Sequence, residues 1–393
     1  MNALSPFSID MYLPGFGEIA KSLKTDIPTV TQSLSSFFIG ISLGQLIYGP
    51  LLDRFGRKKP LYVGLALYLI STALCMRAWN INILIALRFV QAIGSCATTV
   101  TAVAMVRDLF GAKDSAKVFA LLMLVLGASP MIAPTAGGYI VSTFGWRAVF
   151  FVLLLLGVFI TLCTFLLPET TKPDPHFSLK PGPILSNFLS ALKVPQFLVY
   201  MLVQSLAFAG LFAYVAGSPL VFMGIFQLDK KAYGWVFAGL SVAFIGLSQF
   251  NTLLLKKYSS AQIIRVALLA QVLVSLLFIG GNLAGWYGLP LTIVFIFLFL
   301  ACLGFTNPNA AALSLAPFSK NAGTASALLG ATQMGIGSLA SFGVSAFSNG
   351  TSNPMIIIMA VSSLLGLLVL GIGIRSGKLS TEAPTGEAAP LMH

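Results

Sequence analysis

Charged residues are scarce in this sequence. Only 9% of its 393 residues are Asp, Glu, Lys or Arg, whereas a soluble domain carries roughly 25%. Apolar residues make up 57% of the chain, which is unlike the composition of a disordered protein. These two departures exclude a soluble globular protein and a disordered one, and they leave a polytopic membrane protein.

Histidine and cysteine are also rare. The two histidines, His176 and His393, lie in polar segments. No apolar run therefore contains the His-x-x-Glu-His cluster or the Ser/His couple that an intramembrane enzyme needs. The four cysteines lie in or at the edges of apolar runs and form no Cys-x-x-Cys pair, so we expect free thiols and no metal site. A channel is disfavoured because no filter sequence is repeated.

The sequence contains many long apolar runs. Each run must satisfy its own backbone hydrogen bonds in lipid, so we expect helices. Twelve helices of roughly 20 residues use about 240 residues and leave no room for a large soluble domain. The predicted fold class is an all-α polytopic membrane protein. The expected spans are 3–20, 30–52, 60–78, 82–106, 116–141, 147–168, 195–222, 231–254, 262–283, 290–316, 322–346 and 354–375.

A polar stretch divides these spans into two sets of six. It covers 169–193 and contains four prolines, which is typical of a linker and not of a span. Two six-helix bundles suggest a transporter that is built from repeats and works by alternating access. The expected parts are an N-terminal bundle (1–168), a cytoplasmic linker (169–193), a C-terminal bundle (194–375) and a cytoplasmic tail (376–393).

The basic residues indicate how the chain lies in the membrane. With the N-terminus inside, 16 of the 23 Lys and Arg residues fall on the cytoplasmic side, 6 fall on the opposite side, and Arg88 lies within a span. Cytoplasmic loops retain Lys and Arg, so this asymmetry predicts that both termini are cytoplasmic. The net charge of +12 then reports topology, and we expect no nucleic-acid partner.

Two charged residues lie where topology does not explain them. Asp10 is the only acid well inside an apolar run, and a carboxylate at mid-membrane costs roughly 2.5–3.5 kcal/mol on insertion scales. Its carboxyl can take up and release a proton as its surroundings change. The alternative is a helix-breaking or capping Asp near a short, irregular terminus, flanked by Pro6 and Pro14. Arg88 is either a buried cation that partners an acid or polar backbone, or a side chain that snorkels to the outer interface.

The most specific string covers 49–61, between the second and third spans, and reads Gly-Pro-Leu-Leu-Asp-Arg-Phe-Gly-Arg-Lys-Lys-Pro-Leu. Gly56 permits a tight turn and Gly49 permits close helix approach. Asp53 can cap a helix or pair with an Arg, so this conformational-lock loop can hold two helices in one state and release them in the other. The string resembles the signature loop of the major facilitator superfamily, G-x-L-x-D-R-x-G-R-K-x-x-L, which implies the major facilitator fold. Its candidate residues are Gly49, Asp53, Arg54, Gly56, Arg57 and Lys58.

A second string lies in the fifth span at 127–138. Pro130 and Pro134 share a helix face and free backbone carbonyls, and Gly137 and Gly138 let another helix pack closely. Ordinary small-residue packing is the alternative. The string resembles the antiporter motif of the drug:proton branch of the superfamily, with Ala133-Pro134 where that motif usually has Gly-Pro.

Further strings narrow the resemblance to the bicyclomycin and chloramphenicol resistance (Bcr/CflA) family of multidrug efflux proteins. In that family an acid in the first span is a proton site and an Arg in the fourth span is coupled to it. The resemblance therefore implies these roles for Asp10 and Arg88. Family members usually carry more sequence before this acid, which leaves open whether Met1 is the natural start. The strings are Ser8-Ile-Asp10-Met-Tyr12-Leu-Pro14, Arg88-Phe-Val-Gln91-Ala-Ile-Gly94, Val106-Arg107-Asp108-Leu109 and Trp146-Arg147.

A substrate cavity is expected between the two bundles. Aromatic and polar residues recur every fourth position on one face of the seventh span, although such stripes also occur in packing. Asn307-Pro308-Asn309 is also expected to open the tenth helix locally. The candidate cavity residues are Tyr12, Gln91, Tyr200, Gln204, Phe208, Phe212, Asn307 and Asn309.

The sequence therefore predicts a drug:proton antiporter that exports small lipophilic compounds across the bacterial inner membrane. Its expected partners are drug-like substrates, protons and lipid. It is expected to work as a monomer, with the proton gradient as energy source and no cofactor. The alternative in the same fold is a proton-coupled or facilitative transporter of a metabolite or nutrient, because a fold alone does not set the direction of transport.

Overall fold

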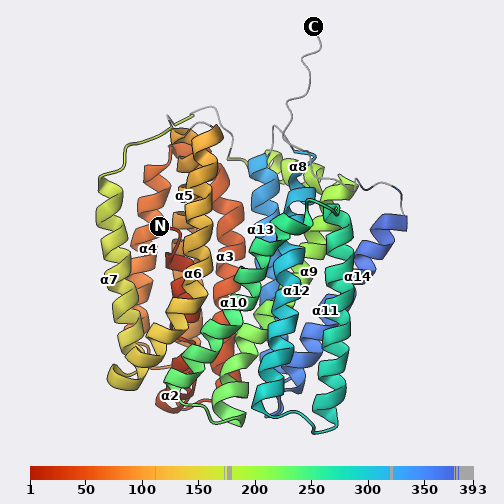
Figure 1. The fold of residues 1–393 in the computed structure, drawn as a ribbon. Helices are drawn as coiled ribbons and strands as arrows, with labels where there is room; N and C mark the ends of the chain where they lie inside the picture. Colours follow the sequence, from red (N-terminus) through yellow and green to blue (C-terminus); the bar gives the residue numbers. More distant parts are fainter. Residues whose placement is uncertain are drawn as a thin grey trace.

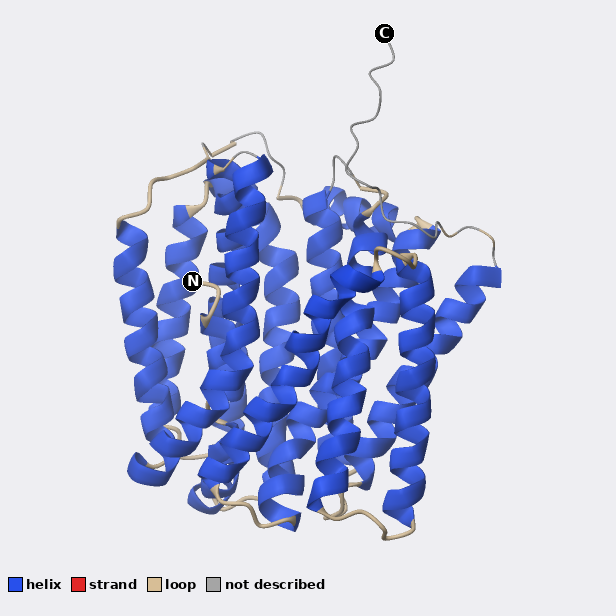
Figure 2. Ribbon diagram, in the orientation of Figure 1, coloured by secondary structure: helices blue, strands red, loops and turns tan. Residues whose placement is uncertain are grey.

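The protein is a bundle of long helices (Figure 1). The structure is a computed structural model, and it describes residues 1–110, 112–171, 173–174, 179–318, 322–375, 377 and 379. Within these ranges every regular element is helical and none is a strand, as Figure 2 shows. The elements are α1 (Leu4–Asp10), η1 (Leu13–Gly15), α2 (Phe16–Ser22), α3 (Ile27–Phe55), α4 (Lys58–Met76), α5 (Ile81–Leu109), α6 (Ala112–Phe144), α7 (Trp146–Phe165), α8 (Pro181–Leu192), α9 (Pro195–Ser218), η2 (Pro219–Ile225), α10 (Lys230–Leu254), α11 (Ser260–Leu283), α12 (Leu289–Leu315), α13 (Ala322–Ala346) and α14 (Asn353–Arg375).

Eleven helices of the described chain are long and apolar enough to cross a membrane. They correspond to the second through twelfth expected spans. The first expected span, 3–20, is not one continuous helix, because α1, η1 and α2 divide it into three short pieces. The N-terminus lies partway along the height of the bundle, and α2 lies at its lower end in Figure 1.

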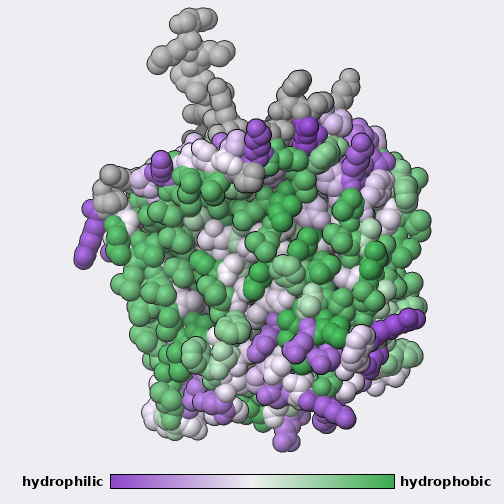
Figure 3. Space-filling view, turned by 180° about the vertical axis from the view of Figure 1, so that it is seen from behind, coloured by the Kyte–Doolittle hydropathy of each residue, from purple (hydrophilic) through white to green (hydrophobic). Residues whose placement is uncertain are grey.

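The surface of the molecule is apolar around its middle. Figure 3 shows a broad belt of hydrophobic side chains, with hydrophilic ones gathered mainly toward the two ends. Large apolar side chains such as Leu162, 60% exposed, and Val266, 67% exposed, contribute to this surface. Such a belt is compatible with hydrocarbon and not with water, so the chain is a multi-pass membrane protein.

The early and late helices occupy opposite sides of the bundle. In Figure 1, the helices up to α7 (red to yellow) lie on the left and the later helices (green to blue) lie mainly on the right, with α10 crossing the middle toward α6. The two sides meet where α3 packs along α13 and α6 packs along α10. We call residues before and after the linker the N-terminal and C-terminal halves; their bounds stay a prediction.

Small hydroxyl residues and aromatic rings join α3 to the C-terminal half. Ser35 Oγ of α3 donates to Ser341 Oγ of α13 over 2.7 Å. The ring of Phe38 lies 4.3 Å, centroid to centroid, from that of Phe212 on α9. Small residues allow helix backbones to approach closely in a membrane, and the two halves are therefore in direct contact over this part of their interface.

Two local features differ from expectation. The linker contains a helix, α8, whose Ala191 is buried in a cluster with Phe197 of α9 and Ala325 of α13. The expected opening at 307–309 is wrong, since α12 continues through Pro308. Pro308 leaves the Gly304 carbonyl without its helical donor, and Asn309 Nδ2 adds a side-chain hydrogen bond to the next carbonyl, that of Phe305, over 2.8 Å.

Candidate functional site

The first membrane segment breaks directly after Asp10. In an α-helix the N–H of residue i+4 donates to the carbonyl of residue i, and the residue four positions after Asp10 is Pro14, which has no N–H. The helix α1 therefore ends at Asp10, and the chain continues through the single turn η1. The expectation of an unbroken first span is wrong for this reason. Discontinuous membrane helices are where many transporters place their binding sites.

Arg88 of α5 occupies the space at this break. Its side chain is fully buried. The Nη2 donates to the Ser8 carbonyl over 2.7 Å, and Nη1 donates to Gln91 Oε1 over 2.6 Å. Ser8 lies in the last turn of α1, where carbonyls lack helical donors and a cation is favoured. Arg88 therefore caps the end of α1 and does not reach the outer interface.

Aromatic rings surround the buried guanidinium. The Arg88 Cζ lies 4.3 Å from the ring centroid of Tyr12 and 4.1 Å from that of Phe37. The Tyr12 hydroxyl hydrogen-bonds with Ser33 Oγ at 2.9 Å, which fixes the ring. Ring faces attract cations, so this environment stabilises the charge without a carboxylate.

A polar network extends from the break to α4. Gln91 Nε2 donates to Thr72 Oγ1 over 2.7 Å, and Ser8 Oγ lies within hydrogen-bond distance, 2.9 Å, of the Tyr68 hydroxyl. Tyr68 is completely buried. Sequence reasoning missed Tyr68 and Thr72, since both look like ordinary members of the third span.

Asp10 is buried beside this network but does not belong to it. Its side chain is 5% exposed. Among the described residues, no hydrogen bond or ion pair holds its carboxyl group, and the donors of Arg88 point to Ser8 and Gln91. Asp10 can therefore gain or lose a proton without breaking an interaction that holds the bundle together.

The glycines of α6 bring the break close to the C-terminal half. A Cβ on Gly137 would collide with the carbonyl oxygen of Met11, the residue after Asp10. A Cβ on Gly138 would collide with the carbonyl of Lys230, at the start of α10. Only glycine permits these backbone approaches, so α6 contacts the break on one side and α10 on the other.

The prolines of α6 free a carbonyl for the same contact. Pro134 has no N–H, so the carbonyl of Pro130 has no donor within the helix. The Ser241 Oγ of α10 lies 3.4 Å from that carbonyl and shares its proton with the nearer Phe237 carbonyl of its own helix, at 2.9 Å. Thr135 Oγ1 likewise shares its proton between the Met131 carbonyl of its own helix, at 2.9 Å, and the Gly234 carbonyl of α10, at 3.1 Å. The four antiporter-motif residues thus lie on the interface between α6 and α10 or beside it.

The conformational-lock loop is tied to the end of α5. The Arg57 Nε donates to Asp108 Oδ2 over 2.8 Å, and Nη1 donates to Asp53 Oδ1 over 3.0 Å. Burial acts against ionisation of Asp108, but hydrogen bonds from Arg57, Thr171 and Thr170 outweigh it and lower the pKa of this carboxyl below its ordinary value. The described partners of this charge cluster lie in the N-terminal half and the start of the linker.

Glu169, which sequence reasoning missed, holds the other side of the loop. Its carboxylate accepts hydrogen bonds from the backbone N–H groups of Arg57, over 2.7 Å, and Lys58, over 3.0 Å. These N–H groups belong to the start of α4, where an anion is favoured. Gly56 has φ +80° and lies against the Glu169 carboxyl group, so a side chain at this position would be both strained and crowded.

The remaining loop residues have smaller roles. The Arg54 Nη1 donates to the Asp174 carbonyl over 3.1 Å, and Lys58 Nζ donates to the Leu167 carbonyl, just beyond the end of α7. The expected close helix approach at Gly49 is wrong, because a Cβ there meets nothing within 4 Å. The approach occurs at Gly44, where a Cβ would lie 2.8 Å from Cys96 Cβ of α5.

The candidate cavity residues fall into separate groups. Tyr12 and Gln91 belong to the Arg88 site. In the C-terminal half, Gln204 Nε2 donates to Asn307 Oδ1 over 2.9 Å, and the buried Gln204 Oε1 has no hydrogen-bond partner among the described residues. The structure thus brings Gln204 and Asn307 together, but it does not bring them to the break in the first span.

The other cavity candidates pack inside the C-terminal half, except that Phe212 also contacts Phe38 of α3 in the N-terminal half. Phe208 contacts Phe212 with ring centroids 5.3 Å apart. Tyr200 is buried in an apolar cluster with residues of α11, α12 and α14. Asn309 Nδ2 donates to Asn251 Oδ1 over 2.7 Å, which joins α12 to α10.

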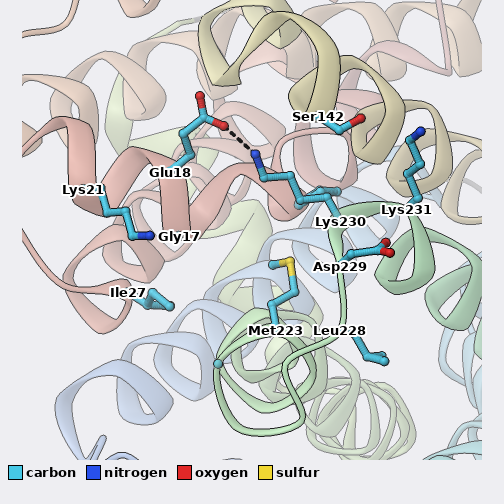
Figure 4. A pocket seen from close by; sticks show the side chains of 12 residues that line it. Gly17, Glu18, Lys21, Ile27, Ser142, Met223, Leu228, Asp229, Lys230 and Lys231 are labelled. Atoms are coloured by element: carbon cyan, nitrogen blue, oxygen red, sulfur yellow. Dashed lines mark hydrogen bonds and ion pairs between the residues drawn. The ribbon is translucent and has the colours of Figure 1, made fainter.

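An ion pair links the halves at the end of the bundle that contains α2. Glu18 Oε2 of α2 lies 2.7 Å from Lys230 Nζ of α10, and Figure 4 shows the two side chains pointing toward one another. They border a pocket of about 750 Å³, which Lys21, Met223 and Asp229 also line. Sequence reasoning placed neither Glu18 nor Lys230 in a functional site, because only the packing of the two halves brings α2 and α10 together.

Comparison with known proteins gives a consistent result. A family model described as "Major Facilitator Superfamily" matches residues 1–342. A "Bicyclomycin resistance protein homolog" of Haemophilus influenzae is 33% identical over 371 residues, covering 94% of this chain and 92% of that protein. The "Multidrug resistance protein MdtL" of Shigella flexneri is 28% identical over 380 residues, with 93% and 92% covered.

Solved structures share the fold at low sequence identity. A bacterial homologue of the human lysosomal transporter Spinster, in an inward-facing and occupied conformation, has a TM-score of 0.71 at 13% identity and covers 98% of this chain and 97% of its own. A D-xylose–proton symporter has a TM-score of 0.69 at 14% identity, with 94% and 95% covered. These likenesses show the arrangement of helices and nothing about the substrate.

Proposed function

The chain belongs to the bicyclomycin-resistance branch of the Major Facilitator Superfamily, and we propose that it exports small lipophilic drugs across the bacterial inner membrane in exchange for protons. The names of the relatives support drug efflux as the activity. The similarity to these relatives extends over more than nine-tenths of the chain. It supports a class of substrate for this protein and does not identify a compound.

The single observation that carries the coupling mechanism is the buried carboxyl group of Asp10 at the helix break, which no described residue binds. In the proposed cycle a proton that arrives from outside neutralises Asp10, and the drug is released on that side. Release of the proton to the cytoplasm restores the carboxylate and, with it, affinity for the drug. The proton gradient supplies the energy in this cycle. A charged carboxylate costs much more to bury than a neutral carboxyl, so proton uptake at Asp10 changes which state of the protein is favoured.

Arg88 takes part in this cycle as a fixed cation. It caps α1 through the Ser8 carbonyl and keeps the break open in both protonation states of Asp10. A permanent guanidinium is suited to this task, since Arg stays charged even when buried.

Alternating access is proposed to use the two ends of the bundle. We place the conformational-lock loop and both termini in the cytoplasm, which puts the ion pair of Glu18 and Lys230 at the external end. Breaking that pair and the neighbouring contact of Gly138 with Lys230 opens the external end, while the cluster around Arg57 keeps α3, α4 and α5 together as a unit. One chain contains both halves, and we propose that it works as a monomer.

Growth of a pump-deficient bacterial host tests the drug-export function. Wild-type protein is expected to raise tolerance to a subset of a panel of toxic lipophilic compounds, and Asp10→Asn is expected not to. Asp26→Asn is a matched control, because Asp26 caps α3 through the Thr29 N–H and Asn caps helices equally well. Wild-type protein that protects against no compound in the panel contradicts the proposal.

A further inference from the structure

Tyr214 of α9 carries a buried hydroxyl group without a partner. Its side chain is 1% exposed, and its Oη has no hydrogen bond within the described chain. The ring stacks on Phe237 of α10 with centroids 5.3 Å apart and planes 27° apart, so the hydroxyl is held in place. A buried donor without an acceptor is costly, and a partner in another state of the protein removes that cost.

The charge that acts on this hydroxyl comes from the other half of the protein. Asp10 interacts electrostatically with Tyr214 and with Tyr233 of α10. The halves are in direct contact here, because α6 packs against the Met11 carbonyl through Gly137 and against α10 through Gly138. Met11, the residue after Asp10, lies in the same buried cluster as Tyr214, Tyr233 and Phe237. The Asp10 carboxyl and the Tyr214 hydroxyl, both without a hydrogen bond within the described chain, therefore border the same region of the interface.

Tyr233 provides an internal comparison. It is also completely buried, but its hydroxyl already lies in a hydrogen bond with Ser218 Oγ at 2.8 Å. Of these two tyrosines, Tyr214 is the one whose hydroxyl has no hydrogen bond within the described chain and is free to donate.

The other charged or titratable groups near the break are occupied elsewhere. On α5, Arg88 donates to Ser8 and Gln91, and on α2, Glu18 pairs with Lys230 of α10. Two further tyrosines form hydrogen bonds, Tyr12 with Ser33 and Tyr68 with Ser8. Lys231 lies over the ring of Tyr139 on α6. Arg147 of α7 donates to the Met76 and Ala78 carbonyls.

Resting on the proposed function, we propose that Tyr214 is the positioning residue for proton exchange at Asp10. Its O–H donates a hydrogen bond across the interface to the ionised Asp10 carboxylate. When Asp10 takes up a proton from water, its carboxyl group becomes a weaker acceptor and the hydrogen bond weakens. Tyr214 keeps its own proton throughout. The bond ties the charge state of Asp10 to the contact between the two halves.

Infrared titration of the purified full-length protein in lipid tests this role without knowledge of the drug. The signal is the absorption of the protonated carboxyl group that disappears in Asp10→Asn, followed against pH. Tyr214→Phe removes only the hydroxyl and keeps the ring on Phe237. It is expected to move the midpoint upward by about one pH unit, a tenfold change in proton affinity, since a hydrogen bond to a charged group is lost. Tyr233→Phe is expected to leave the midpoint close to the wild-type value.

The outcomes separate this inference from the proposed function. A midpoint unchanged in Tyr214→Phe, or moved equally by Tyr233→Phe, overturns the role of Tyr214 while Asp10 remains the proton site. If Asp10→Asn removes no titrating band, Asp10 is not a proton site, and both proposals fall. The comparison can be repeated with Asp10 replaced by Glu, which keeps a carboxylate as the acceptor. An equal upward shift of the titration midpoint on adding Tyr214→Phe to Asp10→Glu supports the hydrogen bond.

Discussion

Arg88 donates a hydrogen bond over 2.7 Å to the backbone carbonyl of Ser8 and forms no ion pair with Asp10, two residues further along the same helix. The buried cation and the buried acid thus act on one helix break through different partners. Arg88 fixes the backbone, and Asp10 is left free to exchange a proton. Proton exchange therefore does not have to break an ion pair.

Replacement of the Arg88 guanidinium tests its capping role. Arg88→Lys is expected to lower the rate of drug transport at least tenfold, because a single ammonium cannot serve both Ser8 and Gln91 in the geometry of the guanidinium fork. The measurement is drug uptake into everted membrane vesicles, normalised to the amount of protein. Arg265→Lys, at an exposed position at the start of α11, is the matched control. Wild-type rates in Arg88→Lys would show that the fork geometry is dispensable.

Backbone contact at Gly137 is expected to limit what this position tolerates. Gly137→Ala places a methyl group against the Met11 carbonyl and is expected to destabilise the protein by about 1–3 kcal/mol, seen as a lower thermal-unfolding midpoint in detergent. The control is Gly239→Ala in α10, where a Cβ meets nothing within 4 Å and the midpoint is expected to stay or to rise with helix propensity. Equal midpoints for both variants contradict the contact.

The ion pair of Glu18 and Lys230 is expected to bias the protein toward closure at its external end. Each side chain is 34% exposed, so the pair contributes only about 0.2–1 kcal/mol. Lys230→Glu is therefore expected to increase the labelling rate of a cysteine placed at Met223 by roughly two- to fivefold. The double exchange Glu18→Lys with Lys230→Glu is expected to restore the slow rate. A double exchange that labels as fast as the single variant argues against the pair as the cause.

The cluster around Arg57 is expected to be insensitive to pH near neutrality. The pKa of Asp108 is lowered in the folded protein, so its contribution to stability is complete above the unfolded value, about pH 4, and is lost as pH falls through the folded value below that. The difference in thermal midpoint between wild type and Asp108→Asn is expected to be a few degrees, constant from about pH 5 to about pH 8 and smaller at more acidic pH. A difference that changes across neutral pH contradicts this assignment.

Sequence patterns predicted the long spans because each is set by its own composition. Eleven helices follow the apolar runs, and residues at 49–61 identify a turn whose Gly56 has the positive φ that the pattern requires. The sequence offers the break in the first span only as the alternative interpretation of Asp10, although Pro14 signals it. A proline in an apolar run is compatible with a continuous, kinked helix, and the partner that stabilises the break, Arg88, is 80 residues away from Ser8 in the chain.

Partners that depend on packing could not be predicted from one sequence. Glu169 caps the start of α4 from 112 residues away, and it looked like an ordinary linker residue. Asp10 and Arg88 were singled out because charge is costly in lipid wherever it lies. Tyr214 could not be singled out in this way, since a tyrosine in an apolar span carries no such cost. Only the folded interface shows that its buried hydroxyl lacks a hydrogen-bond partner within the described chain.

Transport in reconstituted vesicles tests the central role of Asp10 most directly. Wild-type protein and Asp10→Asn are placed in proteoliposomes with a compound found by the growth panel, and uptake of that compound is followed after a pH gradient is imposed. The proposed mechanism predicts that the gradient drives accumulation through wild-type protein and not through Asp10→Asn, while exchange of labelled for unlabelled drug without a gradient survives in the variant. Gradient-driven accumulation through Asp10→Asn at the wild-type level would contradict the mechanism.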